Sequence, residues 1–144
     1  SHDAADPVGY AVMAGNKKIG VLTDTGKVTQ EMLGILAGAS VVLLESNHDI
    51  EMLQSGIYPY YLKKRILSTK GHLSNMDAGS ISIELLKKGV RGCLLGHISS
   101  QNNHKQLAYD TVSQILENAG AKVGKDIALM AARRKSVTGL FPLK

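Results

Sequence analysis

Short apolar runs alternate with amphipathic stretches along the whole sequence. The apolar runs predict five strands, the first two joined as a hairpin, over residues 8–13, 18–22, 41–44, 90–95 and 126–130. The spacing of apolar positions and of capping residues predicts helices over 29–38, 50–53, 59–67 and 74–88, and from Ser99 or Ser100 to Gly120. Strands that alternate with helices are typical of an α/β layered domain.

Three of the predicted strands end close to an ionisable residue. The run 18–22 leads to Asp24, the run 41–44 leads to Glu45, and the run 90–95 leads to His97. Because strands packed side by side bring their ends onto one rim of a sheet, we expect these three side chains to meet there. A buried carboxylate needs a positive partner, and a metal ion would serve.

Length and composition set the class of protein. A chain of 144 residues is long enough for one domain with a real core. No apolar run reaches the roughly 20 residues that a membrane-spanning helix needs, and the N-terminus has no signal-peptide pattern. With Cys93 as the single cysteine, these features predict a cytoplasmic protein that does not enter the membrane.

The basic residues suggest an anionic partner. The net charge is +5 and the pI is near 9.4. Lys63, Lys64 and Arg65 follow three tyrosines in residues 58–61, an interleaving that can stack on bases and neutralise phosphates. The cluster therefore predicts substrate-binding residues for nucleic acid, although a solvated helix face accounts for it equally well.

The histidines favour metal chemistry. His2, His48, His72 and His97 fall in predicted loops next to strands, whereas His104 is predicted inside a helix. Imidazole and carboxylate ligands suit Zn²⁺ or a similar divalent ion. The sequence contains no HxH or HExxH pair, no GxSxG and no phosphate-binding GxxxxGK[ST] or GxGxxG loop. Serine nucleophile catalysis and nucleotide-binding folds of those types are therefore disfavoured.

Five short motifs carry a resemblance to a known family: HDAADPVGY at 2–10, TDTG at 23–26, LESNHD at 44–49, GHLSN at 71–75 and LGHIS at 95–99. In this order they resemble the later motifs of the metallo-β-lactamase superfamily. They are most similar to the bacterial branch named YycJ, WalJ or VicX, and more distantly to tRNase Z. The resemblance implies an α/β (α+β) fold, the C-terminal half of a four-layer αββα sandwich. Residues 1–144 would form one partial domain, with 132–144 as an exposed tail.

The resemblance also implies roles for individual residues. His2 resembles a metal ligand of the third motif, Asp24 the carboxylate that bridges two metal ions, and His97 the last histidine ligand. Glu45 and His72 resemble the acid and histidine that nuclease members place beside the scissile phosphate. There the histidine protonates the leaving oxygen or steadies the phosphate, and the acid orients it. Two divalent ions, Zn²⁺ or Mn²⁺, are implied. His48 has no counterpart, and we expect it to have a structural or supporting role.

The HxHxDH motif of the superfamily belongs upstream of His2 and is not in this sequence. We therefore expect the other metal ligands to lie in an N-terminal half. Without that half, the sheet would expose an apolar face, so we expect either that the half is present or that the chain self-associates through this face. Alone, the chain is expected to bind metal poorly and to be inactive.

Together these features predict a metal-dependent hydrolase, a phosphodiesterase or nuclease that removes nucleotides from DNA or RNA with a water activated by two metal ions. The basic stretch just before His72 motivates nucleic acid as the substrate. Two alternatives remain open. One is a hydrolase of a small thioester or lactone, and the other is a non-catalytic domain that binds nucleic acid or regulates a partner.

Overall fold

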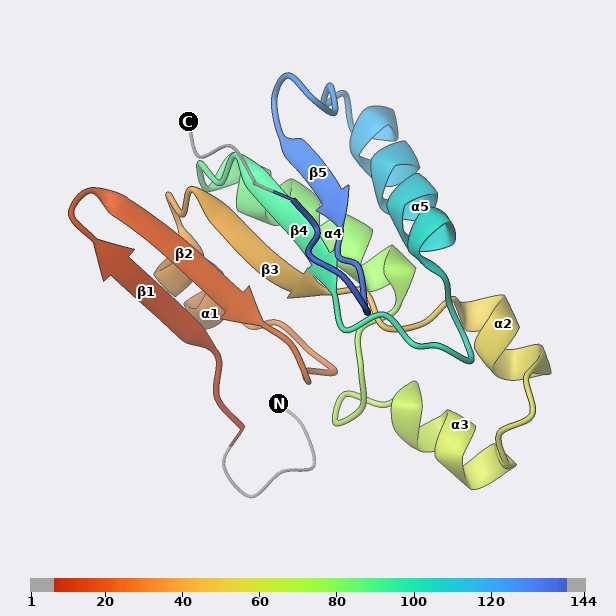
Figure 1. The fold of residues 1–144 in the computed structure, drawn as a ribbon. Coiled ribbons are helices and arrows are strands. Elements are labelled where there is room, and N and C mark those ends of the chain that lie inside the picture. Colours follow the sequence, from red (N-terminus) through yellow and green to blue (C-terminus); the bar gives the residue numbers. More distant parts are fainter. Residues whose placement is uncertain (1–6, 140–144) are drawn as a thin grey trace.

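A computed structural model describes residues 7–139, which contain a five-stranded sheet in the order β1-β2-β3-β4-β5 (Figure 1). The strands are Tyr10–Ala14 (β1), Lys17–Leu22 (β2), Val41–Glu45 (β3), Gly92–Gly96 (β4) and Ala128–Ala131 (β5). β1 pairs with β2 as an antiparallel hairpin, and the other neighbours are parallel. The α/β class and all five predicted strands are confirmed.

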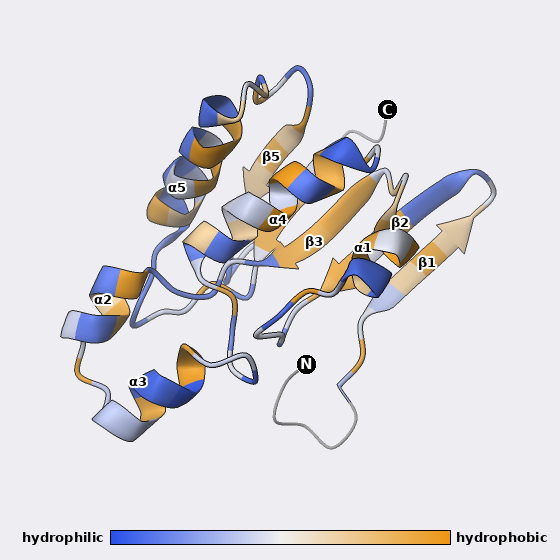
Figure 2. Ribbon diagram, turned by 180° about the vertical axis from the view of Figure 1, so that it is seen from behind, coloured by the Kyte–Doolittle hydropathy of each residue, from blue (hydrophilic) through white to orange (hydrophobic). Residues whose placement is uncertain are grey.

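Five helices accompany the sheet, namely Gln30–Leu36 (α1), Ile50–Ser55 (α2), Tyr60–Ile66 (α3), Asn75–Lys87 (α4) and Lys105–Asn118 (α5). α1, α4 and α5 cover one face of the sheet (Figures 1 and 2). α2 and α3 lie beyond the carboxyl ends of the parallel strands (Figure 1). The chain thus places two short helices beside the rim where the ionisable residues were predicted to meet.

The core lies between the sheet and these covering helices. Alternate strand residues such as Val42, Leu44 and Leu95 are fully buried against Leu85 of α4 and Leu116 of α5. Burial of a leucine side chain contributes about 2 kcal/mol, so this layer holds the strands in place. The period-2 alternation sends every second strand residue to the opposite face.

The opposite face carries an apolar row that crosses all five strands. Tyr10, Val21, Leu43, Leu94 and Met130 are paired in register, and each is at least partly exposed. No helix of residues 7–139 covers this face (Figure 1). A contiguous apolar row without a covering layer is typical of a surface that packs against another part of a protein or a partner.

The helix termini correct one prediction and confirm another. Ser74 and Asp77 form a reciprocal capping box at the start of α4, as predicted. α5 begins later than predicted: its N-cap is His104, whose Nδ1 accepts a hydrogen bond from the Leu107 N–H. His104 is therefore not inside a helix, and neither Ser99 nor Ser100 caps α5. The Ser99 hydroxyl instead accepts from backbone N–H groups within the loop before the helix.

The Cys93 side chain is buried in β4, which raises the pKa of its thiol to about 11. This agrees with the prediction of a small buried hydrophobic residue. Among the helices of residues 7–139, none has the length and apolar character that crossing a membrane requires.

Candidate active site

The carboxyl ends of β2, β3 and β4 bring Asp24, Glu45 and His97 together. Because the three strands are parallel, these ends share one edge of the sheet. His97 Nδ1 lies 2.6 Å from Glu45 Oε1, and His97 Nε2 lies 3.7 Å from Asp24 Oδ1. The predicted meeting of these residues at one rim is confirmed. His2 lies outside the described residues, and its convergence on the same point remains a prediction.

Glu45 is the centre of the site and is fully buried. Its Oε1 receives hydrogen bonds from two imidazoles, from His72 Nδ1 at 2.7 Å and from His97 Nδ1 at 2.6 Å. Its Oε2 accepts from the backbone N–H groups of Thr25, at 2.9 Å, and Leu73, at 3.4 Å. The carboxylate is therefore satisfied entirely by groups of this chain, which makes its burial tolerable.

These contacts set the charges of the site. Burial by itself would raise the pKa of Glu45, but the hydrogen bonds from His72, His97 and Thr25 outweigh it and lower the pKa to about 2. The hydrogen bond to Glu45 raises the pKa of His97 above its ordinary value, against the opposing effect of burial. Because Glu45 is ionised, it can only accept, so Nδ1 of both imidazoles must carry the proton.

The tautomer has a direct consequence for metal binding. With Nδ1 of each ring hydrogen-bonded to Glu45, Nε2 is the ring nitrogen through which His72 and His97 can contact a metal ion. Asp24, His72 and His97 each offer one ligand atom, and these atoms lie within 4.8 Å of one another. Nitrogen and carboxylate donors of this kind suit a divalent transition ion. The donor set therefore fits the metal that the sequence motifs imply, and the fold brings His72 next to Asp24 and His97.

Two of these residues have a strained backbone. Asp24 has φ 53° and His97 has φ 51°, the left-handed region that residues other than glycine rarely adopt. Such strain costs about 1–3 kcal/mol and concentrates at functional sites. Asn47 supports the turn at His97, since its Nδ2 donates to the His97 carbonyl at 2.8 Å. Sequence reasoning missed Asn47, although its position two residues after Glu45 was a usable signal.

A buried amide network also escaped the sequence analysis. Asn103 Nδ2 donates to the carbonyls of Ser46 and Asn47 and to Asn75 Oδ1, and the Ser46 hydroxyl donates to Asn75 Oδ1. These residues join the loops after β3 and β4 to the start of α4. The network fixes the segment that carries Glu45 relative to the segment that carries His97.

His48 lies close to this network but has no comparable partners. The residue is 1% exposed, and neither ring nitrogen finds a hydrogen-bond partner among residues 7–139. Burial lowers the pKa of His48, which keeps the imidazole neutral. The predicted structural role fits this position, since the ring fills space in the interior.

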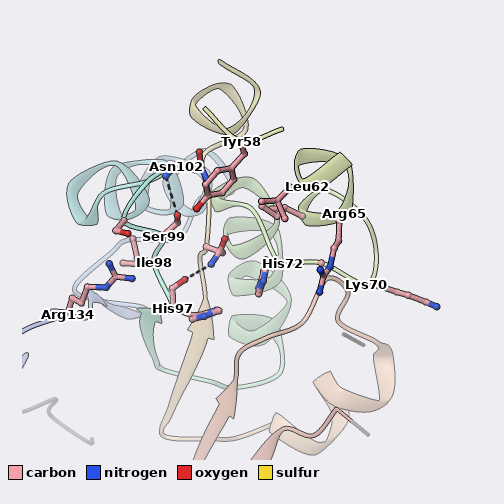
Figure 3. A pocket seen from close by; sticks show the side chains of 14 residues that line it. Tyr58, Leu62, Arg65, Lys70, His72, His97, Ile98, Ser99, Asn102 and Arg134 are labelled. Atoms are coloured by element: carbon pink, nitrogen blue, oxygen red, sulfur yellow. Dashed lines mark hydrogen bonds between the residues drawn. The ribbon is translucent and has the colours of Figure 1, made fainter. Parts of the chain in front are cut away.

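A cavity of about 390 Å³ opens beside the histidine pair (Figure 3). Among the residues that line it are His72, His97, Tyr58, Arg65 and Arg134.

Of the three predicted substrate-binding residues, only Arg65 lines this cavity. Lys63 and Lys64 border another hollow on α3, and Lys63 Nζ donates to the Gln54 carbonyl. Arg134 also lines the cavity; it lies in a run of three basic residues, Arg133 to Lys135, after β5, and was not assigned to the site from the sequence.

Solved structures place this fold in a known class. The metallo-β-lactamase fold protein YhfI from Bacillus subtilis matches 92% of this chain and 42% of its own, with a TM-score of 0.57 and 14% identity. Zn²⁺-bound PqqB from Methylobacterium extorquens matches 92% of this chain and 40% of its own, with a TM-score of 0.58 and 22% identity. The chain therefore has the metallo-β-lactamase fold over part of that fold's length.

Two curated relatives are similar to this chain in amino-acid sequence. Exodeoxyribonuclease YycJ of Bacillus anthracis is 45% identical over 125 residues, which are 87% of this chain and 47% of that protein. Exodeoxyribonuclease WalJ of Streptococcus pneumoniae is 42% identical over 140 residues, 97% of this chain and 52% of that protein. The chain is thus similar to YycJ and WalJ, as the motifs indicated, and spans about half their length. No protein-family model matches the sequence.

Proposed function

We propose that this chain forms part of a metal-dependent exonuclease that hydrolyses phosphodiester bonds of DNA. The observation that carries the proposal is the buried Glu45, which accepts hydrogen bonds from Nδ1 of both His72 and His97 next to Asp24. The cavity beside this group contains cationic side chains, which suit a polyanion. The relatives YycJ and WalJ are named exodeoxyribonucleases, which favours DNA over RNA.

In this proposal Asp24 and His97 hold metal, together with His2 and with ligands from a further part of the protein. The cofactor is a pair of divalent ions, Zn²⁺ or Mn²⁺. When bound, such ions stabilise charge on a phosphoryl group and lower the pKa of water. The contribution of Glu45 is to fix the tautomer and direction of both imidazoles.

His72 has the geometry of a general acid or a phosphate clamp. Its Nδ1 is held by Glu45, and its Nε2 side is directed to the region next to the cavity. A proton on Nε2 can pass to the oxygen that leaves when the phosphodiester bond breaks, and the hydrogen bond from Nδ1 to Glu45 holds the ring in place for that transfer. Arg65 would bind a phosphate beside this point, while Lys63 and Lys64 would contact the polymer farther along α3.

The apolar row on the open face of the sheet completes the proposal. We infer that the other half of a longer protein packs on Tyr10, Val21 and Leu43, because this chain spans about half the length of YycJ and WalJ. Residues 1–144 would then form the C-terminal part of a single αββα domain, with 132–144 as its exposed tail. Self-association through the same face is the alternative, and the cytoplasm is the proposed location.

The size of the cavity supports a second candidate function. A volume of about 390 Å³ is also suitable for a small thioester or lactone. In such a hydrolase the metal would act on the substrate carbonyl, and His72 would matter little. His72→Ala therefore separates the two functions.

The proposal is tested on the whole protein that contains this chain. Metal is removed with a chelator, Mn²⁺ or Zn²⁺ is added back, and release of nucleotides from end-labelled DNA is followed. We expect metal-dependent hydrolysis that Asp24→Ala and His72→Ala reduce at least 100-fold, whereas Glu84→Gln on the exposed side of α4 has no effect. Absence of DNA hydrolysis with every metal tested contradicts the proposal. Thioester hydrolysis that survives His72→Ala supports the second function.

A further inference from the structure

We infer that the cavity next to the histidine pair is a seat for a single nucleotide, with Tyr58 stacking on its base and Arg134 contacting its phosphate. The inference rests on the proposed DNA hydrolysis and assigns the part of the substrate that this cavity receives. Tyr58 and Arg134 belong to none of the five motifs that carry the family resemblance. Their role follows from where the fold places them.

The cavity wall has an apolar part suited to a base. Leu62 and Ile66 of α3 lie one turn apart on its wall, and Ile98 lines it from the loop after β4. Tyr58 is half-buried and lies across the cavity from His97 (Figure 3). A flat ring next to aliphatic side chains is the surface on which nucleobases stack, with little preference for which base.

Local sequence explains why Tyr58 is held there. It lies in the connection of residues 56–59 between α2 and α3, directly before Pro59, which restricts it to extended backbone. Gly56 packs so closely that a Cβ atom there would lie 2.7 Å from the Met52 carbonyl oxygen and 2.8 Å from Asn102 Oδ1. The neighbouring Ile57 is 86% exposed, so the chain turns the aromatic residue, not the aliphatic one, toward the cavity.

The remaining wall is cationic and suits a phosphate. Arg65 and Arg134 line opposite flanks of the cavity (Figure 3), and the Ser99 hydroxyl lies between Arg134 and Tyr58 on the lining. Arg134 lines the same cavity as His72 and His97. A phosphate held by Arg134 would therefore lie near the imidazole pair, where bond cleavage is proposed.

The volume is sufficient for one nucleotide. About 390 Å³ is near the lower end of the range of small-molecule sites, roughly 300–1,000 Å³. A base, a sugar and a phosphate fit in such a space. A seat for one terminal nucleotide beside the site of cleavage predicts release of mononucleotides from a strand end.

Equilibrium binding tests the seat without catalysis. The whole protein, treated with chelator, is titrated with three probes: deoxyadenosine monophosphate, deoxyribose 5-phosphate, which lacks the base, and deoxyadenosine, which lacks the phosphate. We expect the monophosphate to bind more tightly than either fragment. Tyr58→Ala should weaken the monophosphate about 5- to 150-fold and leave deoxyribose 5-phosphate unchanged, and Tyr58→Phe should bind like the wild type.

Arg134→Gln should weaken the monophosphate and deoxyribose 5-phosphate about tenfold and leave deoxyadenosine unchanged. The matched controls are Tyr61→Ala and Arg133→Gln, since Tyr61 is 74% exposed and neither residue lines the cavity. Both controls should bind all probes like the wild type.

Monophosphate affinity unchanged in Tyr58→Ala overturns the inference, as does deoxyribose 5-phosphate binding as tightly as the monophosphate. The experiments distinguish failure of the nucleotide seat from failure of the proposed exonuclease. DNA hydrolysis together with unchanged binding in Tyr58→Ala removes the nucleotide seat and leaves the exonuclease. Tyr58-dependent binding without hydrolysis of any DNA supports the seat and removes the exonuclease.

Discussion

Replacement of Glu45 by glutamine is the sharpest test of how the site is held together. Glutamine has nearly the same shape but no charge, and its amide N–H₂ cannot accept from an imidazole. The pKa of Glu45 is lowered from its ordinary 4.5 to about 2, which corresponds to about 3 kcal/mol in favour of the ionised form at neutral pH. We expect Glu45→Gln to lose about this much free energy of unfolding at pH 7.

The same reasoning fixes the dependence on pH. Because the folded pKa is below the unfolded one, the contribution of Glu45 is fully present above pH 4.5 and is lost as pH falls toward about 2. The difference in stability between wild type and Glu45→Gln should therefore shrink from about 3 kcal/mol at pH 6 to about 1.4 kcal/mol at pH 3. Urea unfolding of the whole protein, freed of metal and followed by circular dichroism, measures it.

Glu84→Gln is the matched control. Glu84 is partly exposed on α4 and pairs with Lys87 at 2.7 Å, an exposed ion pair. Its replacement should change the free energy of unfolding by less than about 1 kcal/mol. A Glu45→Gln protein as stable as the wild type at pH 7, or a loss that stays constant down to pH 3, would refute the account of a buried carboxylate stabilised by two imidazoles.

Three further predictions concern neighbouring features. His48→Leu should leave stability at pH 8 unchanged or higher, because it removes two unsatisfied buried nitrogens. Since the pKa of His48 is lowered on folding, wild type should lose stability relative to His48→Leu as pH falls below about 6.5, measured by urea midpoints at pH 8 and pH 5. Asn47→Ala removes the donor to the His97 carbonyl and should reduce metal affinity about 10- to 100-fold with only a small loss of stability, measured by competition with a chelator of known affinity. Leu43→Lys on the open sheet face should destabilise the whole protein and reduce aggregation of the isolated 144-residue chain, checked by thermal unfolding and light scattering. Ile35→Lys on exposed α1 serves as its control and should do neither.

Much of the architecture was readable from hydrophobic patterning. Each of the predicted strands exists, and the parallel order follows from helices placed between strands. The exception is the start of α5. A serine is a good N-cap on average, but the Ser99 hydroxyl is used by the loop, and His104 takes the position through its ring nitrogen. Tertiary contacts override the N-cap preference of serine there, and the local sequence does not encode those contacts.

At the site, sequence reasoning found the residue types but not their connections. Strand ends predicted that Glu45 and His97 would meet, because parallel topology alone brings them together. That one oxygen of Glu45 would receive both imidazoles depends on side-chain directions, to which His72 contributes from a separate loop. The role of Tyr58 was similarly hidden, since three tyrosines lie within residues 58–61 and only the fold turns one of them toward the cavity.

The polar site around Glu45 and the apolar row on the open sheet face differ in how far the described residues supply their contacts. The polar site has its own support: Glu45 is satisfied by four groups of the chain, and its carboxylate orients the two imidazoles. A site preorganised in this way loses little free energy to rearrangement when a ligand arrives. The apolar row through Val21 and Leu43 has no such support within residues 7–139, because no helix covers it. Formation of the hydrogen bonds around Glu45 and burial of the sheet face are therefore separable, and the hydrogen bonds should persist in a variant whose open face is made polar.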